Sequence, residues 1–423
     1  MLDRSQHPPI QEIVNLRLKH PEKIHLSNGI PVYAINMGTQ AVVKIEIIFH
    51  AGRPYEEKAL VARATASMLK EGTNKHSSLD IAEKVDFYGG TLSTPVNLDT
   101  SNVILYALNK HLDKLLPLVA EVIQRPAFPQ QELDLFIQNS RNRLQVDLAK
   151  NDVVAYRTIT EYIFGKKHPY GYNSLPEMYE QLRREDLQEH FQRNYHADAC
   201  AIFISGKIEK GFYDLLDQYL GQMPRGKRAI KRSFEVQTTA PRSVKIHRPD
   251  SVQTAIRIGT RMFNKKHADY HGLFILNAIL GGYFGSRLMA NIREEKGYTY
   301  NIFSTLDTML ADGYFYIGTE VGNEFVAPTI TEIYREIERL QTELVKEEEL
   351  QMVRNYLLGN LLTNLDGPFN MVDVVKSLVL DDLSFAEFDQ AVNRIKTIQP
   401  EELRQLAQQY FRKDQLWELI VGA

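Results

Sequence analysis

The sequence has few cysteines and tryptophans and no long apolar run. Its 423 residues contain one cysteine and one tryptophan. The single cysteine, Cys200, excludes an internal disulfide. Its apolar setting, ACAIFISG, indicates a small buried residue and not a nucleophile. No segment approaches the roughly 18 apolar residues of a membrane span, and MLDRSQHPPIQEIV lacks the apolar core of a secretory signal. We therefore expect a cytoplasmic protein without membrane contact.

The sequence also lacks an excess of basic residues. The formal net charge is -3, so the chain lacks the excess of basic residues that is typical of nucleic-acid-binding proteins. The one dense basic stretch, RGKRAIKRSF from Arg225, is short and favours a solvated linker over a polyanion site. We expect no nucleic-acid partner.

The two halves of the chain repeat each other. REDLQEHFQRNYHADACAIFISG closes the first half and PEELRQLAQQYFRKDQLWELIVG closes the second. Asp186 and Glu402 lie 216 positions apart, as do Gly206 and Gly422. A constant offset over separate segments predicts a duplication, with homologous domains at 1–222 and 242–423 and a Pro-, Gly- and Thr-containing linker at 223–241.

Each half shows the same order of strand and helix patterns. Residues 43–49 alternate apolar and other side chains, which is typical of a strand. Other strands are expected near NVILYAL, TAIRIGT, TYNIFSTL, GYFYIGTEV and LWELIVG. Helices are expected near 56–71, 77–88, 111–124, 130–164, 267–281, 286–296, 325–344, 346–363 and 400–411. We predict an α+β fold in which each domain has a mixed, mostly antiparallel sheet with helices packed on one face.

One candidate site lies on the helix LVARATASMLKEGT. An H-x-x-E-H motif there would place two zinc-binding histidines on one face with a glutamate as base. The sequence instead has Arg63, Ala66 and Ser67, which do not bind zinc well. The small residues of this helix favour close packing.

Two further segments have alternative interpretations. His267 and His271 have a spacing that can chelate a metal, but no third ligand is identifiable, and we expect both on the exposed first turn of a helix. The glycine-rich LGGYFGSRL could cradle a phosphate. It lacks the Lys-Ser/Thr ending of a P-loop. A structural turn that caps the next helix through Ser286 is therefore the favoured interpretation.

A second candidate site lies in SRLMANIREEKGYTYNIF. The helix from Arg287 is expected to end at Gly297, and Tyr298 and Tyr300 are expected to open a strand with opposite orientations. Arg293 and Tyr300 could donate hydrogen bonds to an oxyanion. The alternative is a surface arginine and a core tyrosine.

Several motifs together resemble the pitrilysin/insulinase family of zinc metallopeptidases, in the short-subunit branch that includes processing peptidases and their bacterial relatives. They are LSNGIPVYAI, HAGRPYEE, MLKEGT, YGGTL, HPYG and LGGYFGSRLMANIREEKGYTYNIFS. The resemblance covers nearly the whole chain and implies a duplicated metallopeptidase fold.

The resemblance also implies that the zinc site is lost. Aligning MLKEGT places the family's H-x-x-E-H positions on Arg63, Ala66 and Ser67. The family's third ligand, a glutamate further along, falls near Arg143 or Leu144. We therefore expect no metal or other cofactor on this chain and no peptide hydrolysis by this chain alone.

The family's arginine and tyrosine pair, by contrast, matches Arg293 and Tyr300. In two-subunit relatives, such a pair stabilises the intermediate at the zinc site of an H-x-x-E-H partner. The resemblance thus implies a non-zinc companion subunit of a heterodimeric peptidase, with zinc in the partner and peptides as substrates. The alternative is an inactive scaffold or peptide-binding subunit, which would form a homodimer when isolated.

The strand after Gly89 corresponds to the edge strand that binds extended substrate in active relatives. Its residues are Gly90, Thr91, Leu92 and Ser93. Pro95 lacks an amide hydrogen and removes one hydrogen bond that a substrate strand could use. We expect these residues to bind substrate only weakly.

Overall fold

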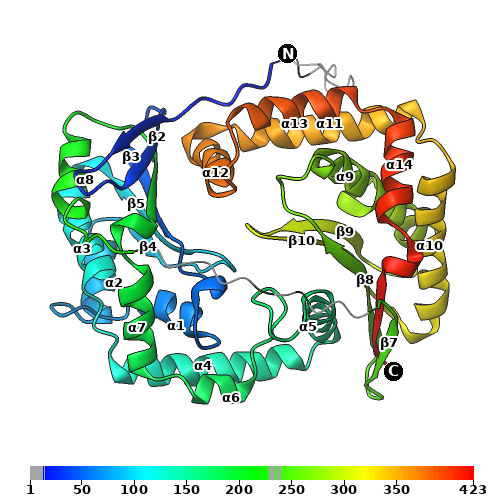
Figure 1. The fold of residues 1–423 in the computed structure, drawn as a ribbon, viewed down its shortest axis with the longest axis horizontal. Helices are drawn as coiled ribbons and strands as arrows, with labels where there is room; N and C mark the ends of the chain where they lie inside the picture. The colour runs from blue at the N-terminus through cyan, green and yellow to red at the C-terminus, as the bar shows by residue number, and fades with distance from the viewer. Residues whose placement is uncertain (1–12, 14, 228–233, 235, 237–239) are drawn as a thin grey trace, which may run out of the picture.

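Two β-sheets, one in each half of the chain, organise the structure (Figure 1). The computed structural model describes residues 13, 15–227, 234, 236 and 240–423. The strands of the first sheet, in spatial order, are β1 (Glu22–His25), β2 (Pro31–Asn36), β6 (Cys200–Gly206), β3 (Val42–Phe49), β5 (Ser101–Leu108) and β4 (Thr91–Ser93). Those of the second are β7 (Ser243–His247), β11 (Trp417–Gly422), β8 (Gln253–Met262), β10 (Gly313–Gly322) and β9 (Ile302–Thr308).

The two sheets have the same topology apart from the extra strand β1. The pairs β2–β6 and β7–β11 are parallel, and every other strand pair is antiparallel. The equivalent strands follow one another in the same spatial order. The predicted duplication and the predicted mixed, mostly antiparallel sheets are therefore confirmed.

Helices surround both sheets. The first half contains α1 (Val61–Met68), α2 (Ser78–Phe87), α3 (Leu112–Gln124), α4 (Gln130–Leu148), α5 (Asn151–Phe164), α6 (Pro176–Glu180), α7 (Arg184–Asn194) and α8 (Phe212–Leu220). The second contains α9 (Tyr270–Asn277), the π-helical η4 (Ala278–Gly282) and η5 (Met289–Glu295), α10 (Val326–Thr342), α11 (Glu347–Asn364), α12 (Gly367–Leu380), α13 (Ala386–Thr397) and α14 (Pro400–Tyr410). Short 3₁₀ turns are η1 (Arg53–Tyr55), η2 (Asn109–His111), η3 (Ala197–Ala199), η6 (Asn323–Phe325) and η7 (Lys413–Gln415).

The first sheet buries one face against the helices of its own half. Val43, Ile45, Ile47 and Phe49 of β3 share a core with residues of α1, α3 and α8. Their side chains alternate with those of the opposite face because successive residues of a strand point to opposite sides. The predicted apolar face of this strand is confirmed.

The other face of β3 is also buried, although its sequence is charged. Lys44 is 3% exposed and Glu46 is 1% exposed. Helix α12, from the second half, covers this face and supplies Asp373, which lies 2.8 Å from the Lys44 ammonium. Lys376 of α12 donates to both carboxylate oxygens of Glu46 at 2.9 and 3.1 Å. Asn102 of β5 also donates to Glu46, at 2.8 Å.

Helix α5 makes the reciprocal contact. It belongs to the first half by sequence but packs on the second sheet, where Ala155 and Ile159 join a core with Leu419 and Val421 of β11 (Figure 1). Its Tyr162 stacks on Trp417 at 4.8 Å. Helices α5 and α12 begin 216 positions apart, which is the offset of the duplication. Each half therefore donates the equivalent helix to the other.

Some predicted elements differ in detail. The helix expected at 56–71 begins only at Val61, because Leu60 adopts a left-handed conformation with φ 72°. The region 130–164 forms two helices, and α12 and α13 have no counterpart among the predicted helices. The domain boundaries at 222 and 242 stay a prediction, and residues 228–233, 235 and 237–239 of the predicted linker lie outside the described residues. Among the described helices, none combines the length and apolar character needed to cross a membrane.

Candidate functional site

The positions of the expected zinc motif lie on α1 and do not form a metal site. Arg63 is exposed and donates a 3.4 Å hydrogen bond to the Tyr179 hydroxyl, Ala66 is fully buried, and Ser67 is half-buried. Leu144 is buried on α4, beside the exposed Arg143. Within the described residues, no group of three or more histidine, cysteine, aspartate or glutamate side chains could hold a metal ion. The residues of this helix therefore do not fit zinc.

A buried polar network fixes the start of α1. Glu56, 7% exposed, accepts hydrogen bonds from the Ala62 amide and the Tyr172 hydroxyl. Burial raises the pKa of Glu56, although these hydrogen bonds oppose that shift. Arg53 lies 4.3 Å from the centre of the Tyr172 ring and donates to the Pro169 carbonyl. The HAGRPYEE and HPYG motifs thus have a structural role, which is to position the helix.

The expected substrate strand is β4, at the edge of the first sheet. Thr91, Leu92 and Ser93 pair with β5 on one side, and no described strand pairs with them on the other. Gly90 directly precedes the strand, and Pro95 lies beyond its end. The strand is in a position to accept an extended peptide, while its role in substrate binding stays a prediction.

Arg293 lies in the last turn of η5, and Tyr300 lies on the segment that connects η5 to β9. Gly297, with φ 67°, follows the end of η5 in the expected left-handed conformation. The strand begins only at Ile302, so the expectation that Tyr298 and Tyr300 open it is wrong. Tyr298 is half-buried and stacks on Phe325 at 4.9 Å, whereas Tyr300 is 91% exposed.

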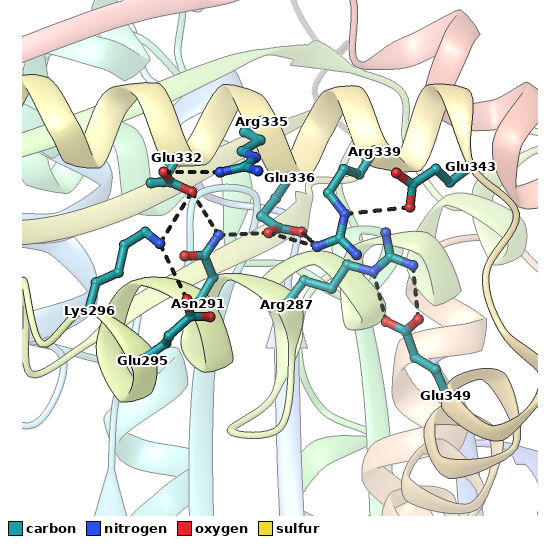
Figure 2. Close-up of polar contacts among 10 residues, drawn as sticks. All are labelled: Arg287, Asn291, Glu295, Lys296, Glu332, Arg335, Glu336, Arg339, Glu343 and Glu349. Atoms are coloured by element: carbon teal, nitrogen blue, oxygen red, sulfur yellow. Dashed lines mark hydrogen bonds and ion pairs between the residues drawn. The ribbon is translucent and has the colours of Figure 1, made fainter.

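The Arg293 guanidinium has an unusual environment. Its central carbon lies 4.5 Å from the centre of the Phe284 ring. Among the described residues it has no carboxylate partner and no hydrogen bond to Tyr300. By contrast, Arg287, Arg335 and Arg339 are paired with acids, as Figure 2 shows. Among the described residues, the charge of Arg293 is therefore not compensated by an acidic side chain.

The opposite side of η5 is fixed by a charged network that the sequence interpretation missed (Figure 2). The Asn291 side-chain amide donates to Glu332 at 3.0 Å and to Glu336 at 2.7 Å, both on α10. Arg287 forms a two-point ion pair with Glu349 of α11, with both distances 2.8 Å. The i, i+4 spacing of Glu332 and Glu336 places them on one helix face, which is the one sequence signal for this anchor.

The glycine-rich segment 280–288 comprises the end of η4 and the structural turn that leads to η5. A side chain at Gly281 would lie 2.6 Å from the Ser304 amide nitrogen of β9, so a glycine lets the strand approach. The expected cap by the Ser286 hydroxyl is wrong. This hydroxyl is buried without a hydrogen-bond partner among the described residues, and the Ser286 backbone carbonyl accepts from the Ala290 amide.

The histidine pair does not share a helix face. His267 lies before the start of α9, stacks on Phe263 at 3.7 Å and accepts a hydrogen bond from the Asp269 amide. His271 lies 2.7 Å from the Glu387 carboxylate. The two rings therefore have separate partners. The expected placement of both on the first turn of a helix is wrong, because His267 precedes α9 and only His271 lies in its first turn.

Comparisons with known proteins agree with the motifs and the fold. Residues 32–167 match the family model described as insulinase (peptidase family M16), and residues 181–357 match the peptidase M16 inactive domain. The uncharacterized zinc protease YmxG of Bacillus subtilis (strain 168) is 21% identical over 398 residues, which are 93% of this chain and 96% of that protein. The non-peptidase homolog YmxG of Helicobacter pylori (strain ATCC 700392 / 26695) is 24% identical over 75% of this chain and 74% of its own.

A solved structure is similar over nearly the whole chain. The crystal structure of a peptidase M16 inactive domain from Pseudomonas fluorescens has a TM-score of 0.88 and 20% identity, covering 96% of this chain and 98% of that one. This likeness shows the same fold.

The two family models together span most of the sequence, and the chain belongs to the peptidase M16 family. Its α1 lacks the zinc-binding motif of the active members. The match to the inactive domain and the likeness to a non-peptidase homologue, together with this loss, support a catalytically inactive M16-like protein.

Proposed function

We propose that this chain is the non-zinc subunit of a heterodimeric metallopeptidase that degrades or processes peptides. The observation that carries the proposal is the contrast between the two halves. The zinc positions of the first half hold Arg63, Ala66 and Ser67, while the second half keeps Arg293 and Tyr300. These two side chains are a cation without a described carboxylate partner and a tyrosine that is 91% exposed.

Arg293 and Tyr300 act on the substrate carbonyl at the partner's site in this proposal. A guanidinium and a phenol are fixed hydrogen-bond donors, and both stabilise an oxygen on which negative charge develops during attack. Zinc held by an H-x-x-E-H motif in the partner would supply the activated water. The two domains of each chain would together enclose a chamber that admits unfolded peptides.

The test is a cleavage assay on a mixture of this chain with the H-x-x-E-H homologue of the same organism. A quenched fluorescent peptide mixture serves as substrate. We expect Arg293→Ala to lower turnover about 10²–10³-fold, because this is the typical cost of losing one oxyanion donor. Tyr300→Phe removes only the hydroxyl and tests the second donor.

Arg143→Ala is the matched control, since Arg143 is 81% exposed on α4 and has no role in the proposed site. The shared-site proposal fails if Arg293→Ala and Tyr300→Phe leave turnover at the level of the Arg143→Ala control. Association of the two chains is measured separately by light scattering. This distinguishes a variant that fails to form the complex from one that forms it but cleaves slowly.

A second candidate is an inactive scaffold or peptide-binding subunit. The name of the Helicobacter pylori relative, a non-peptidase homolog, favours this alternative. It predicts a homodimer in solution and peptide binding without a partner, through the open edge of β4. A neighbouring reading frame with H-x-x-E-H and a later glutamate would favour the peptidase instead.

A further inference from the structure

We propose that Phe284 is a positioning residue that holds the Arg293 guanidinium for its role in the partner's active site. This inference rests on the proposed function. The observation behind it is the 4.5 Å distance from the guanidinium carbon to the centre of the Phe284 ring. Phe284 is 60% exposed, so its ring does not contribute mainly to a core.

The chemistry of the contact suits a group that must bind a negative oxygen. A carboxylate would hold the guanidinium more strongly but would neutralise it and occupy its N–H groups. An aromatic ring attracts the cation through its quadrupole and leaves the charge uncompensated. The ring therefore orients Arg293 and keeps its donors available for a substrate carbonyl.

The loop that carries Phe284 is itself anchored. The neighbouring Tyr283 stacks on Tyr356 of α11 with ring centres 4.7 Å apart, and its hydroxyl lies 3.8 Å from the sulfur of Met352. At the start of the loop, Gly281 lies so close to β9 that a side chain would collide with Ser304. Both contacts fix the backbone just before the exposed ring.

The helix that carries Arg293 is anchored from its other side. Asn291, two residues before Arg293, is held by Glu332 and Glu336 of α10 (Figure 2). Glu336 is 2% exposed, so this anchor is buried. The Phe284 ring thus fixes the side chain of Arg293, and the Asn291 amide fixes the helix that carries it.

The experiment compares Phe284→Leu, Phe284→Tyr and Phe87→Leu in the mixture with the H-x-x-E-H homologue. Phe87 is an equally unusual exposed phenylalanine, 81% exposed on α2, and is the matched control. We expect Phe284→Leu to lower kcat about 3- to 30-fold with little change in KM, because the range of cation–π energies corresponds to such factors. Phe284→Tyr keeps the ring and should restore kcat to near the wild-type value.

The inference is overturned if Phe284→Leu leaves kcat unchanged or if Phe284→Tyr loses as much as Phe284→Leu. An increase in KM alone also overturns it, since Arg293 is proposed to act on the transition state. Thermal unfolding of each variant checks that the fold is intact.

A measurement on the isolated chain separates this inference from the proposed function. In NMR spectra of protein labelled on arginine, the side-chain resonances of Arg293, assigned with Arg293→Lys, should carry a ring-current shift. We expect Phe284→Leu to abolish that shift, and Phe284→Tyr and Phe87→Leu to preserve it. Absence of the shift in the wild type overturns the positioning role. If the wild-type chain shows the ring-current shift but the wild-type mixture does not cleave peptides, the proposed function is wrong and the contact between Phe284 and Arg293 still stands.

Discussion

The buried charges between β3 and α12 give the sharpest stability prediction. Glu46→Gln keeps the shape of the side chain but removes its charge. Lys44 and Lys376 then share Asp373 as their one described carboxylate partner. Removing one member of a buried ion pair typically costs about 3–5 kcal/mol. We expect about 3 kcal/mol here, because the Lys376 side chain is 21% exposed and can turn toward water.

A double variant isolates the electrostatic part of this loss. Lys44→Met combined with Glu46→Gln leaves Lys376 and Asp373 as a neutral pair. The uncompensated buried ammonium is then gone, so the two substitutions together should cost about 1–3 kcal/mol less than the sum of the single effects. Lys114→Met is the control, since the Lys114–Asp113 pair is exposed and its loss should leave the free energy of unfolding essentially unchanged.

The assay is urea unfolding followed by tryptophan fluorescence and by circular dichroism. Trp417 is the sole tryptophan, and it lies at the contact between the second sheet and α5. Coincident transitions from the two probes would show that both halves unfold together, which a single free energy of unfolding requires. Additive effects of Lys44→Met and Glu46→Gln, or a Glu46→Gln variant as stable as Lys114→Met, would refute the reasoning.

Three other expectations concern pH, packing and metal content. Burial raises the pKa of Asp373, but hydrogen bonds from Lys376 and Lys44 outweigh this effect and lower the pKa below its ordinary value of 3.8. The ionised Asp373 therefore stabilises the fold above pH 3.8, and this contribution is lost as the pH falls through the lower pKa of the folded state. The difference in urea midpoint between wild type and Asp373→Asn should therefore narrow in acid. Gly281→Ala should lower the free energy of unfolding by about 1–3 kcal/mol through collision with Ser304, whereas Gly359→Ala, in open space on α11, should raise it by about 0.5–1 kcal/mol. Elemental analysis should find no stoichiometric zinc in the purified chain, and a chelator should leave its thermal midpoint unchanged.

The duplicated sheets were predictable because their information is local. Strand alternation and the constant offset between Asp186 and Glu402 lie in the sequence itself. The loss of the zinc motif at Arg63, Ala66 and Ser67 was readable through the family resemblance that MLKEGT carries. Local patterns also gave the helix end at Gly297, since its left-handed conformation favours glycine.

The exchange of α5 and α12 was not predictable in the same way. An amphipathic pattern indicates that a helix face is buried but not which sheet buries it. The charged side chains Lys44 and Glu46 suggest a solvated strand face, because their partners on α12 lie more than 300 residues away in sequence. The contact between Arg293 and Phe284 was missed for a related reason. It depends on a glycine-rich loop and a π-helical segment whose geometry has no clear sequence signal.

The exchange of helices has a consequence for how the chain is made. When the first half leaves the ribosome, the face of its sheet that carries Lys44 and Glu46 has no cover, because α12 is synthesised more than 150 residues after β6. The first half can therefore complete its fold only after the second half has been synthesised. Either half expressed alone would expose the sheet face that the other half's helix covers. The same reciprocity is the arrangement expected if two copies of a single half, each covering the other with one helix, were joined into one chain.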